Sequence, residues 1–288
     1  MTGQQGQDPL VSTAWLADHL SAPDVRVVDA SWYLPEEGRD AKAEYEAGHI
    51  PGAIFFDLMD VRDSASAYPM MLPDPVKFSS RVRTMGLGDG HRIVVYDGAG
   101  LFSAARVWWM FRVMGHQDVM VLDGGLPKWK AEDRELEDLP PLGASRPRHF
   151  TARKRAMMVR DTDAVAQAVQ SGSAQVVDAR SPGRFAGEED EPRADVRPGH
   201  IPGSLNVHYK TLLAADGTMK SAAAIRAAFE SAGVDWTRPL ITSCGSGVSA
   251  AILSLALERA GHPEVSLYDG SWAEWGSRHE LPVATGRS

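Results

Sequence analysis

Cysteine is almost missing from this sequence, since Cys244 is the only one among 288 residues. One thiol cannot form an internal disulfide, so packing must hold the fold, and a reducing, cytoplasmic compartment is expected. The sequence also has no run of about 18 apolar residues, the length that a membrane-spanning helix needs. Its first residues, MTGQQGQDPL, lack the basic start and apolar stretch of a secretory signal. We therefore expect a protein that is neither exported nor held in a membrane.

Positively charged residues are also fewer than negatively charged ones. Lysine and arginine number 30 against 38 aspartates and glutamates, for a formal net charge of -8 at pH 7. This balance argues against a general affinity for nucleic acid or anionic membranes, so local groups must attract any anionic ligand. The histidines are scattered, and the sequence has neither paired cysteines nor an HExxH motif. No metal and no organic cofactor is expected.

What the sequence does contain is an internal repeat. VVDA occurs at residues 27–30 and again at 176–179, and GHIPG occurs at 48–52 and at 199–203. The motifs keep the same order in both halves, and a repeat of about half the chain is too long for a solenoid unit. The repeat therefore indicates two homologous domains in tandem.

The boundary between these domains is predicted from composition. The stretch ELEDLPPLGASRPRH combines prolines, charges and small residues without a hydrophobic period, as linkers do. We expect an N-terminal domain over residues 1–137, a linker over 138–150 and a C-terminal domain over 151–288. Within each half, short apolar runs such as VRVVDA, RIVVYD and VMVLDG alternate with helical patterns. That alternation predicts an α/β fold in which each domain is a mainly parallel sheet flanked by helices.

The single cysteine lies where a strand gives way to a helix. RPLITSC is typical of a buried strand that ends at Cys244, and SAAILSLALERAG is typical of a helix that ends at Gly261. Gly245 and Gly247 allow the turn to curl, so that several backbone amides point at one anion beside the helix N-terminus. These dipoles favour a thiolate over a neutral thiol, and Cys244 is therefore predicted to be a nucleophile. The alternative is a small, inert, buried hydrophobic residue.

The first half offers an internal comparison for this turn. Its matching segment, YDGAGLFSAARVWWM, carries Asp97 where the second half carries Cys244. A carboxylate cannot replace a thiolate as a sulfur nucleophile, so the N-terminal domain is predicted to be non-catalytic. The histidines of the two GHIPG motifs, His49 and His200, are expected to be hydrogen-bonded turn residues.

Taken together, the motifs resemble those of tandem-domain rhodanese-like sulfurtransferases, and among them the 3-mercaptopyruvate sulfurtransferases. The matching segments run in family order as GHIPGAIFFD, SAARVWWMFRVMGH, LDGGLPKW, DARSPGRFAGEEDEPR, RPGHIPGSLNV and CGSGVSA. The resemblance implies two rhodanese domains with the active site at their interface. It also implies that Cys244 takes sulfur from 3-mercaptopyruvate as a persulfide, releases pyruvate, and passes the sulfur to a thiol acceptor such as thioredoxin.

The resemblance assigns substrate binding to two arginines. Arg184 and Arg193 match the family's substrate-binding pair, and planar guanidinium groups suit bidentate binding of a carboxylate. The alternative is that both arginines form surface ion pairs with the acidic run at residues 188–191. Substrate contacts in the cysteine loop are assigned to Gly245, Gly247 and Val248.

A proton relay is the part of the family pattern that this sequence breaks. Ser246 matches the loop serine of the family, and Asp57 matches an aspartate that acts with it through a histidine. Relatives read HMLP where this chain has Met70 in place of the histidine. Methionine cannot carry a proton, so Ser246 and Asp57 are catalytic candidates whose link is missing.

Three other functions compete with this interpretation. A thiosulfate sulfurtransferase has the same fold and persulfide, but those enzymes place cations after the cysteine, where this chain has Ser246 between glycines. A cysteine phosphatase needs arginine six residues beyond the cysteine, and Ala250 stands there. A persulfide carrier that catalyses no turnover is the third alternative.

Overall fold

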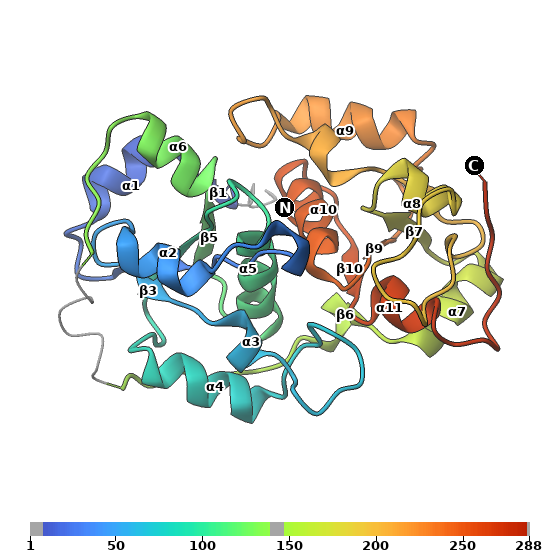
Figure 1. The fold of residues 1–288 in the computed structure, drawn as a ribbon, viewed down its shortest axis with the longest axis horizontal. Helices are drawn as coiled ribbons and strands as arrows, with labels where there is room; N and C mark the ends of the chain where they lie inside the picture. The colour runs from blue at the N-terminus through green and yellow to red at the C-terminus, as the bar shows by residue number, and fades with distance from the viewer. Residues whose placement is uncertain (1–7, 139–146, 287–288) are drawn as a thin grey trace, which may run out of the picture.

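The computed structural model describes residues 8–138 and 147–286 and contains two parallel five-stranded sheets (Figure 1). The strand order is β1-β5-β4-β2-β3 in the first sheet and β6-β10-β9-β7-β8 in the second, so the two halves share one topology. This confirms the predicted duplication and the α/β fold. Residues 139–146 of the predicted linker lie outside the described residues, and the domain boundaries stay a prediction.

The strands are short, and each sheet is built from one half of the chain. The first sheet contains β1 (Leu10–Val11), β2 (Val25–Asp29), β3 (Ile54–Phe55), β4 (Arg92–Tyr96) and β5 (Val119–Leu122). The second contains β6 (Val159–Arg160), β7 (Gln175–Asp178), β8 (Leu205–Asn206), β9 (Leu240–Ser243) and β10 (Val265–Tyr268).

Helices follow the strands in both halves. Those of the first half are α1 (Thr13–His19), α2 (Ala41–Ala47), α3 (Leu58–Val61), α4 (Pro75–Thr84), α5 (Ser103–Val113) and α6 (Gly125–Ala131). Those of the second are α7 (Thr162–Ser171), α8 (Pro182–Ala186), α9 (Ala222–Ser231), α10 (Val248–Arg259) and α11 (Ser271–Trp275). Three 3-10 turns complete them: η1 (Pro35–Glu37), η2 (Ala156–Met158) and η3 (Tyr209–Leu212).

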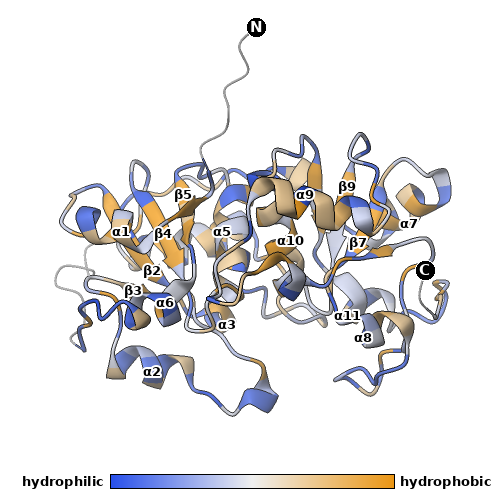
Figure 2. Cartoon of the chain, turned by 90° about the horizontal axis from the view of Figure 1, so that it is seen from above, coloured by the Kyte–Doolittle hydropathy of each residue, from blue (hydrophilic) through white to orange (hydrophobic). Residues whose placement is uncertain are grey.

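Both faces of each sheet are covered, which explains the near-continuous apolar runs of the strands. In β4, Ile93 and Val95 pack with residues of α4 and α5, whereas Val94 and Tyr96 pack with α1 and α6 on the opposite face. The second sheet repeats the pattern, with α9 and α10 on one face and α7 and α11 on the other. Figure 2 shows strands such as β4 and β9 as apolar segments inside a more polar shell.

A single apolar core joins the two halves. α5 and α10 pack side by side at the centre of the molecule (Figure 1), and their buried side chains belong to one continuous cluster that also includes strands of both sheets. Because the carboxyl ends of β4 and β9 lead into these two helices, the loops before α5 and α10 are held near the junction. No helix in the described ranges combines the length and the apolar composition that crossing a membrane requires.

The two GHIPG motifs form matching turns. The Nδ1 atom of His49 lies 2.7 Å from the carbonyl oxygen of Tyr45, and that of His200 lies 2.8 Å from the carbonyl oxygen of Phe185. Each imidazole also stacks on the ring of the same partner, with centroids 4.0 and 3.8 Å apart. The prediction that these histidines are turn residues is confirmed.

Candidate active site

The loop after β9 carries Cys244 and is fastened by the start of α11. The carbonyl oxygens of Cys244 and Gly245 accept hydrogen bonds from the amides of Trp272 and Ala273, both at 2.8 Å. The amide of Cys244 donates to the hydroxyl of Ser271 at 3.2 Å. These bonds hold the loop against the start of α11.

One amide of the predicted cradle contacts the sulfur, and three others are unpaired among the described residues. The amide of Gly247 donates to the Sγ atom of Cys244 at 3.1 Å, and Gly247 has a φ of 81°, in the left-handed region that favours glycine. Within the residues that the structure describes, the amides of Gly245, Ser246 and Val248 have no hydrogen-bond acceptor. α10 begins at Val248, so its N-terminal dipole adds to the positive potential at the sulfur. The arrangement can stabilise a thiolate or a bound anion.

The matching loop of the first half already holds an anion of its own. Asp97 follows β4 as Cys244 follows β9, and its fully buried carboxylate accepts hydrogen bonds from four backbone amides at 2.6–2.9 Å. Burial raises the pKa of Asp97, although the four amides counteract the shift. The loops of the two halves are therefore cradles of the same kind, one filled by a side chain and the other open.

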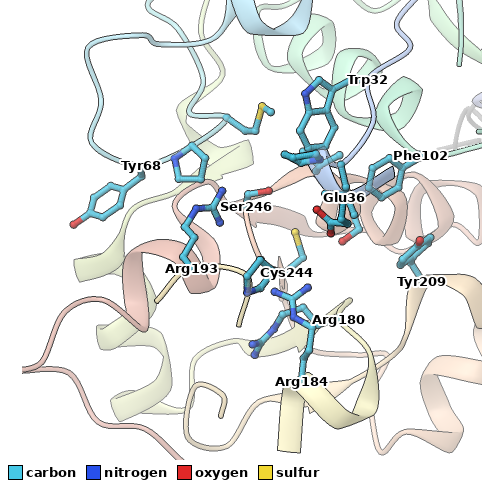
Figure 3. Close-up of a pocket in the computed structure, with 18 of the residues that line it drawn as sticks. Trp32, Glu36, Tyr68, Phe102, Arg180, Arg184, Arg193, Tyr209, Cys244 and Ser246 are labelled. Atoms are coloured by element: carbon cyan, nitrogen blue, oxygen red, sulfur yellow. The ribbon is translucent and has the colours of Figure 1, made fainter. Parts of the chain in front are cut away.

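Cys244 lies at the bottom of a cavity of about 930 Å³ between the two halves (Figure 3). Its residue surface is only 1% exposed, so a ligand must enter the cavity to reach the sulfur. Aromatic side chains form one side of the cavity, and arginines lie on the other sides of Cys244. The aromatic residues are Trp32, Phe102 and Tyr209, and the cationic ones are Arg62, Arg180, Arg184, Arg193 and Lys210.

The two predicted substrate-binding arginines differ in their surroundings. Arg184 is 27% exposed and donates from Nη2 to the carboxylate of Glu191 at 2.5 Å. A side chain at Gly245 would begin 3.1 Å from Nη2 of Arg184, which places this guanidinium directly beside the cysteine loop. Arg193 is exposed and forms no ion pair within the described residues. Both line the cavity. Of the two, only Arg184 forms an ion pair with the acidic run within the described residues, the alternative to substrate binding, and its partner Glu191 is buried.

Arg180 is a cavity residue that sequence reasoning missed. It is almost fully buried between Asp178 and Glu191, each 2.7 Å away, and it also donates to the carbonyl oxygen of Gly199. Burial alone would lower the pKa of Arg180, but the two carboxylates outweigh it and raise the pKa. The repeat contained a signal, because VVDA is followed by arginine in the second half and by Ser31 in the first. The sequence shows no comparable signal for Arg62, Lys210 or the aromatic residues that line the cavity.

The structure separates the candidates for a proton relay. Ser246 is half-buried and lines the cavity. Asp57 is exposed, caps α3 by accepting hydrogen bonds from the amides of Met59 and Asp60, and is not among the cavity residues. Met70 is buried in the cavity wall, where the family pattern has a histidine. A relay from Asp57 to Ser246 would therefore start at a residue outside the cavity lining and pass through Met70, which cannot carry a proton.

The remaining loop candidates take different places. Val248 and Gly245 line the cavity, whereas Gly247 lies outside the lining and contacts the sulfur through its amide. Among the described residues, no group of three or more His, Cys, Asp or Glu side chains could hold a metal ion. Burial lowers the pKa of His208, another cavity residue, which favours its neutral form near pH 7.

Comparison with known proteins agrees with this geometry. The family model described as Rhodanese-like domain matches residues 12–132 and 161–278. The chain is 42% identical to the human 3-mercaptopyruvate sulfurtransferase over 96% of each chain, and 42% identical to the rat thiosulfate sulfurtransferase over 97% of this chain and 96% of that one. The crystal structure of SseA from Escherichia coli, a 3-mercaptopyruvate sulfotransferase by its description, superposes with a TM-score of 0.84 at 40% identity, covering 92% of this chain and 99% of that one. The chain belongs to the rhodanese-like sulfurtransferase family and carries two copies of the Rhodanese-like domain.

Proposed function

We propose that this protein is a 3-mercaptopyruvate sulfurtransferase that works through a persulfide on Cys244. The Cys244 thiolate attacks the thiol sulfur of the donor, and an S–S bond forms as the donor's C–S bond breaks. The electron pair of that bond goes to the three-carbon fragment, which leaves as pyruvate enolate and takes a proton from water. A thiolate of the acceptor then attacks the outer sulfur, so that Cys244 is regenerated.

One observation carries the proposal: the open cradle around Cys244 lies beside the guanidinium of Arg184 in the cavity between the two halves. The cradle supports a negative sulfur, and Arg184 can bind the carboxylate of the donor through N–H groups that Glu191 does not use. Arg193 can bind the same carboxylate from the opposite side of the loop (Figure 3).

Thiosulfate is the second candidate donor. The residues directly after Cys244 are neutral, which favours a donor with one carboxylate over a dianion. Five cationic side chains nevertheless line the cavity, and the rat relative is named for thiosulfate. We expect measurable but weaker use of thiosulfate.

The acceptor and the compartment are also part of the proposal. A thiol acceptor such as thioredoxin, in the reducing cytoplasm, would close the cycle and release the enzyme for another turnover. A carrier that only stores the persulfide would form it once and stop. Catalytic release of pyruvate thus separates the enzyme from the carrier.

The test is to mix the purified protein with 3-mercaptopyruvate and a dithiol, and to measure pyruvate over many turnovers. Mass spectrometry of the protein with donor alone should find one extra sulfur at Cys244. A higher kcat/KM for thiosulfate than for 3-mercaptopyruvate would reverse the choice of donor. An active enzyme whose Cys244 stays unmodified would contradict the mechanism.

A further inference from the structure

A buried ion pair that the proposed chemistry does not use connects the two halves behind the cysteine loop. Arg106 of α5 is fully buried, and its Nη2 lies 2.6 Å from Oδ1 of Asp269, which follows β10 in the other half. The guanidinium also lies over the ring of Trp109, 4.4 Å from its centroid. Removing two charges from water offsets most of the attraction between them, so a buried ion pair adds little stability. The groups that this pair contacts indicate a different role.

The pair holds backbone on both sides of the cavity. Arg106 donates to the carbonyl oxygen of Met70 and, from Nη1 at 3.4 Å, to that of Gly247. The second carboxylate oxygen of Asp269 accepts the amide of Leu72 at 2.7 Å. Met70 lies in the cavity wall of the first half, and Gly247 is the residue whose amide contacts the sulfur. One ion pair thus fixes the wall and the cradle relative to each other.

The backbone is strained at Met70 and tightly packed at Gly247, the two residues whose carbonyl oxygens Arg106 contacts. Met70 has a φ of 56°, which costs conformational energy for a residue with a side chain. Gly247 has no room for one, since a Cβ atom would lie 2.9 Å from the carbonyl oxygen of Asp269 and 3.1 Å from Nη1 of Arg106. Arg106 therefore bonds a strained segment at Met70 and packs tightly against Gly247.

The duplication supplies a second clamp that can serve as a control. Asp123 follows β5 as Asp269 follows β10, and it accepts the amide of Met219 in the other half at 2.7 Å. Arg259 donates to the carbonyl oxygen of Met219 at 2.8 Å and lies 3.8 Å from Asp123. This clamp also joins the halves, but none of its three residues lines the cavity.

We propose that Arg106 and Asp269 are positioning residues for sulfur transfer. They place the Gly247 amide on the sulfur and hold the Met70 wall against the cysteine loop, while the clamp of Arg259 and Asp123 only joins the halves. The role in turnover rests on the proposed function, but the placement of the amide governs the reactivity of Cys244 toward any electrophile.

The test compares Arg106→Met with Arg259→Met, matched losses of an arginine that bridges the halves. Two rates are measured, alkylation of Cys244 by iodoacetamide at one fixed pH and persulfide formation in a single turnover with 3-mercaptopyruvate. Arg106→Met should slow both by about ten- to a hundredfold, because a misplacement of the order of 1 Å can cost that much. The KM for 3-mercaptopyruvate should change less than about threefold, since Arg184 is untouched. Arg259→Met should keep both rates within about twofold of wild type.

Stability is separated from positioning by a further pair of variants. Asp269→Asn keeps the side chain's shape, and the double variant Arg106→Met/Asp269→Leu leaves no unpaired buried charge, so it should unfold at a higher urea concentration than Arg106→Met, which leaves Asp269 unpaired. Slow alkylation in a double variant that is folded without urea supports positioning. Alkylation within about twofold of wild type in that variant, or an equal loss in Arg259→Met, would overturn the proposal. A wild-type protein whose Cys244 is alkylated by iodoacetamide but forms no persulfide with 3-mercaptopyruvate would refute the proposed function alone.

Discussion

Replacing Arg184 with alanine should damage donor binding without damaging the fold. Arg184 is partly exposed, and its buried partner Glu191 keeps a second ion pair, to Arg180 at 2.7 Å. The truncation therefore leaves no carboxylate unpaired. A lost hydrogen bond from a charged group costs about 1.5–3 kcal/mol, which corresponds to roughly a ten- to 150-fold loss in kcat/KM for 3-mercaptopyruvate.

Arg180→Ala is the comparison variant for stability. Arg180 is buried and pairs with both Asp178 and Glu191, so its removal leaves two buried carboxylates without this partner and should cost about 3–5 kcal/mol of unfolding free energy. Pyruvate release gives kcat/KM, urea denaturation gives stability, and alkylation by neutral iodoacetamide shows that Cys244 is intact. An Arg184→Ala enzyme within about twofold of the wild-type kcat/KM would refute the assignment of Arg184 to the donor carboxylate.

Three further changes test the rest of the site. Cys244→Ser should abolish pyruvate release while the protein stays folded by circular dichroism, and residual turnover would point to another nucleophile. Ser246→Ala should lower kcat/KM by roughly tenfold at most, because the Ser246 hydroxyl forms no hydrogen bond within the described residues and one bond to the donor would be worth about 0.5–1.5 kcal/mol; a thousandfold loss would mean that another group has taken over the relay. Asp97→Asn should lower the unfolding free energy by about 1–3 kcal/mol for each amide left unpaired, without a change in kcat. Burial raises the pKa of Asp97 above its ordinary value of 3.8, so the unfolded chain loses this proton at a lower pH than the folded protein does. The wild-type free energy of unfolding therefore falls as the pH rises from 3.8 to the raised pKa, and the urea midpoints of Asp97→Asn should lack this pH dependence.

Features that depend on local sequence were predicted well. The strand before Cys244, the helix after it and the positive φ of Gly261 follow from an apolar run, a periodic stretch and a helix-ending glycine. The duplication was visible because VVDA and GHIPG recur in order, and both sheets adopt the same strand order. The cradle around Cys244 is local in the same sense, since it depends on two glycines and a helix start.

Features that depend on distant contacts were not predicted. Nothing near Arg106 in the sequence indicates that its partners are Met70, Gly247 and Asp269, because these lie on three separate segments that only the packed α5 and α10 bring together. The assignment of Asp57 came from the resemblance rather than from its neighbours. Its local context also indicates a structural role, since an aspartate that directly precedes a helix is a common N-cap, and the structure places Asp57 at the N-cap of α3. Its catalytic role stays a prediction.

The two halves show what separates a scaffold from a reactive site in this fold. Asp97 and Cys244 occupy the same turn of the same topology, and each turn directs backbone amides at the side chain. In the first half the carboxylate satisfies four of these amides, so the cradle has no capacity left for a ligand. In the second half one amide contacts the sulfur and its neighbours stay open, and a persulfide or a thiolate can use them. Chemistry at this turn therefore requires an unfilled cradle as well as a nucleophile. Cysteine supplies both, because its one sulfur accepts a single amide where the two oxygens of Asp97 accept four.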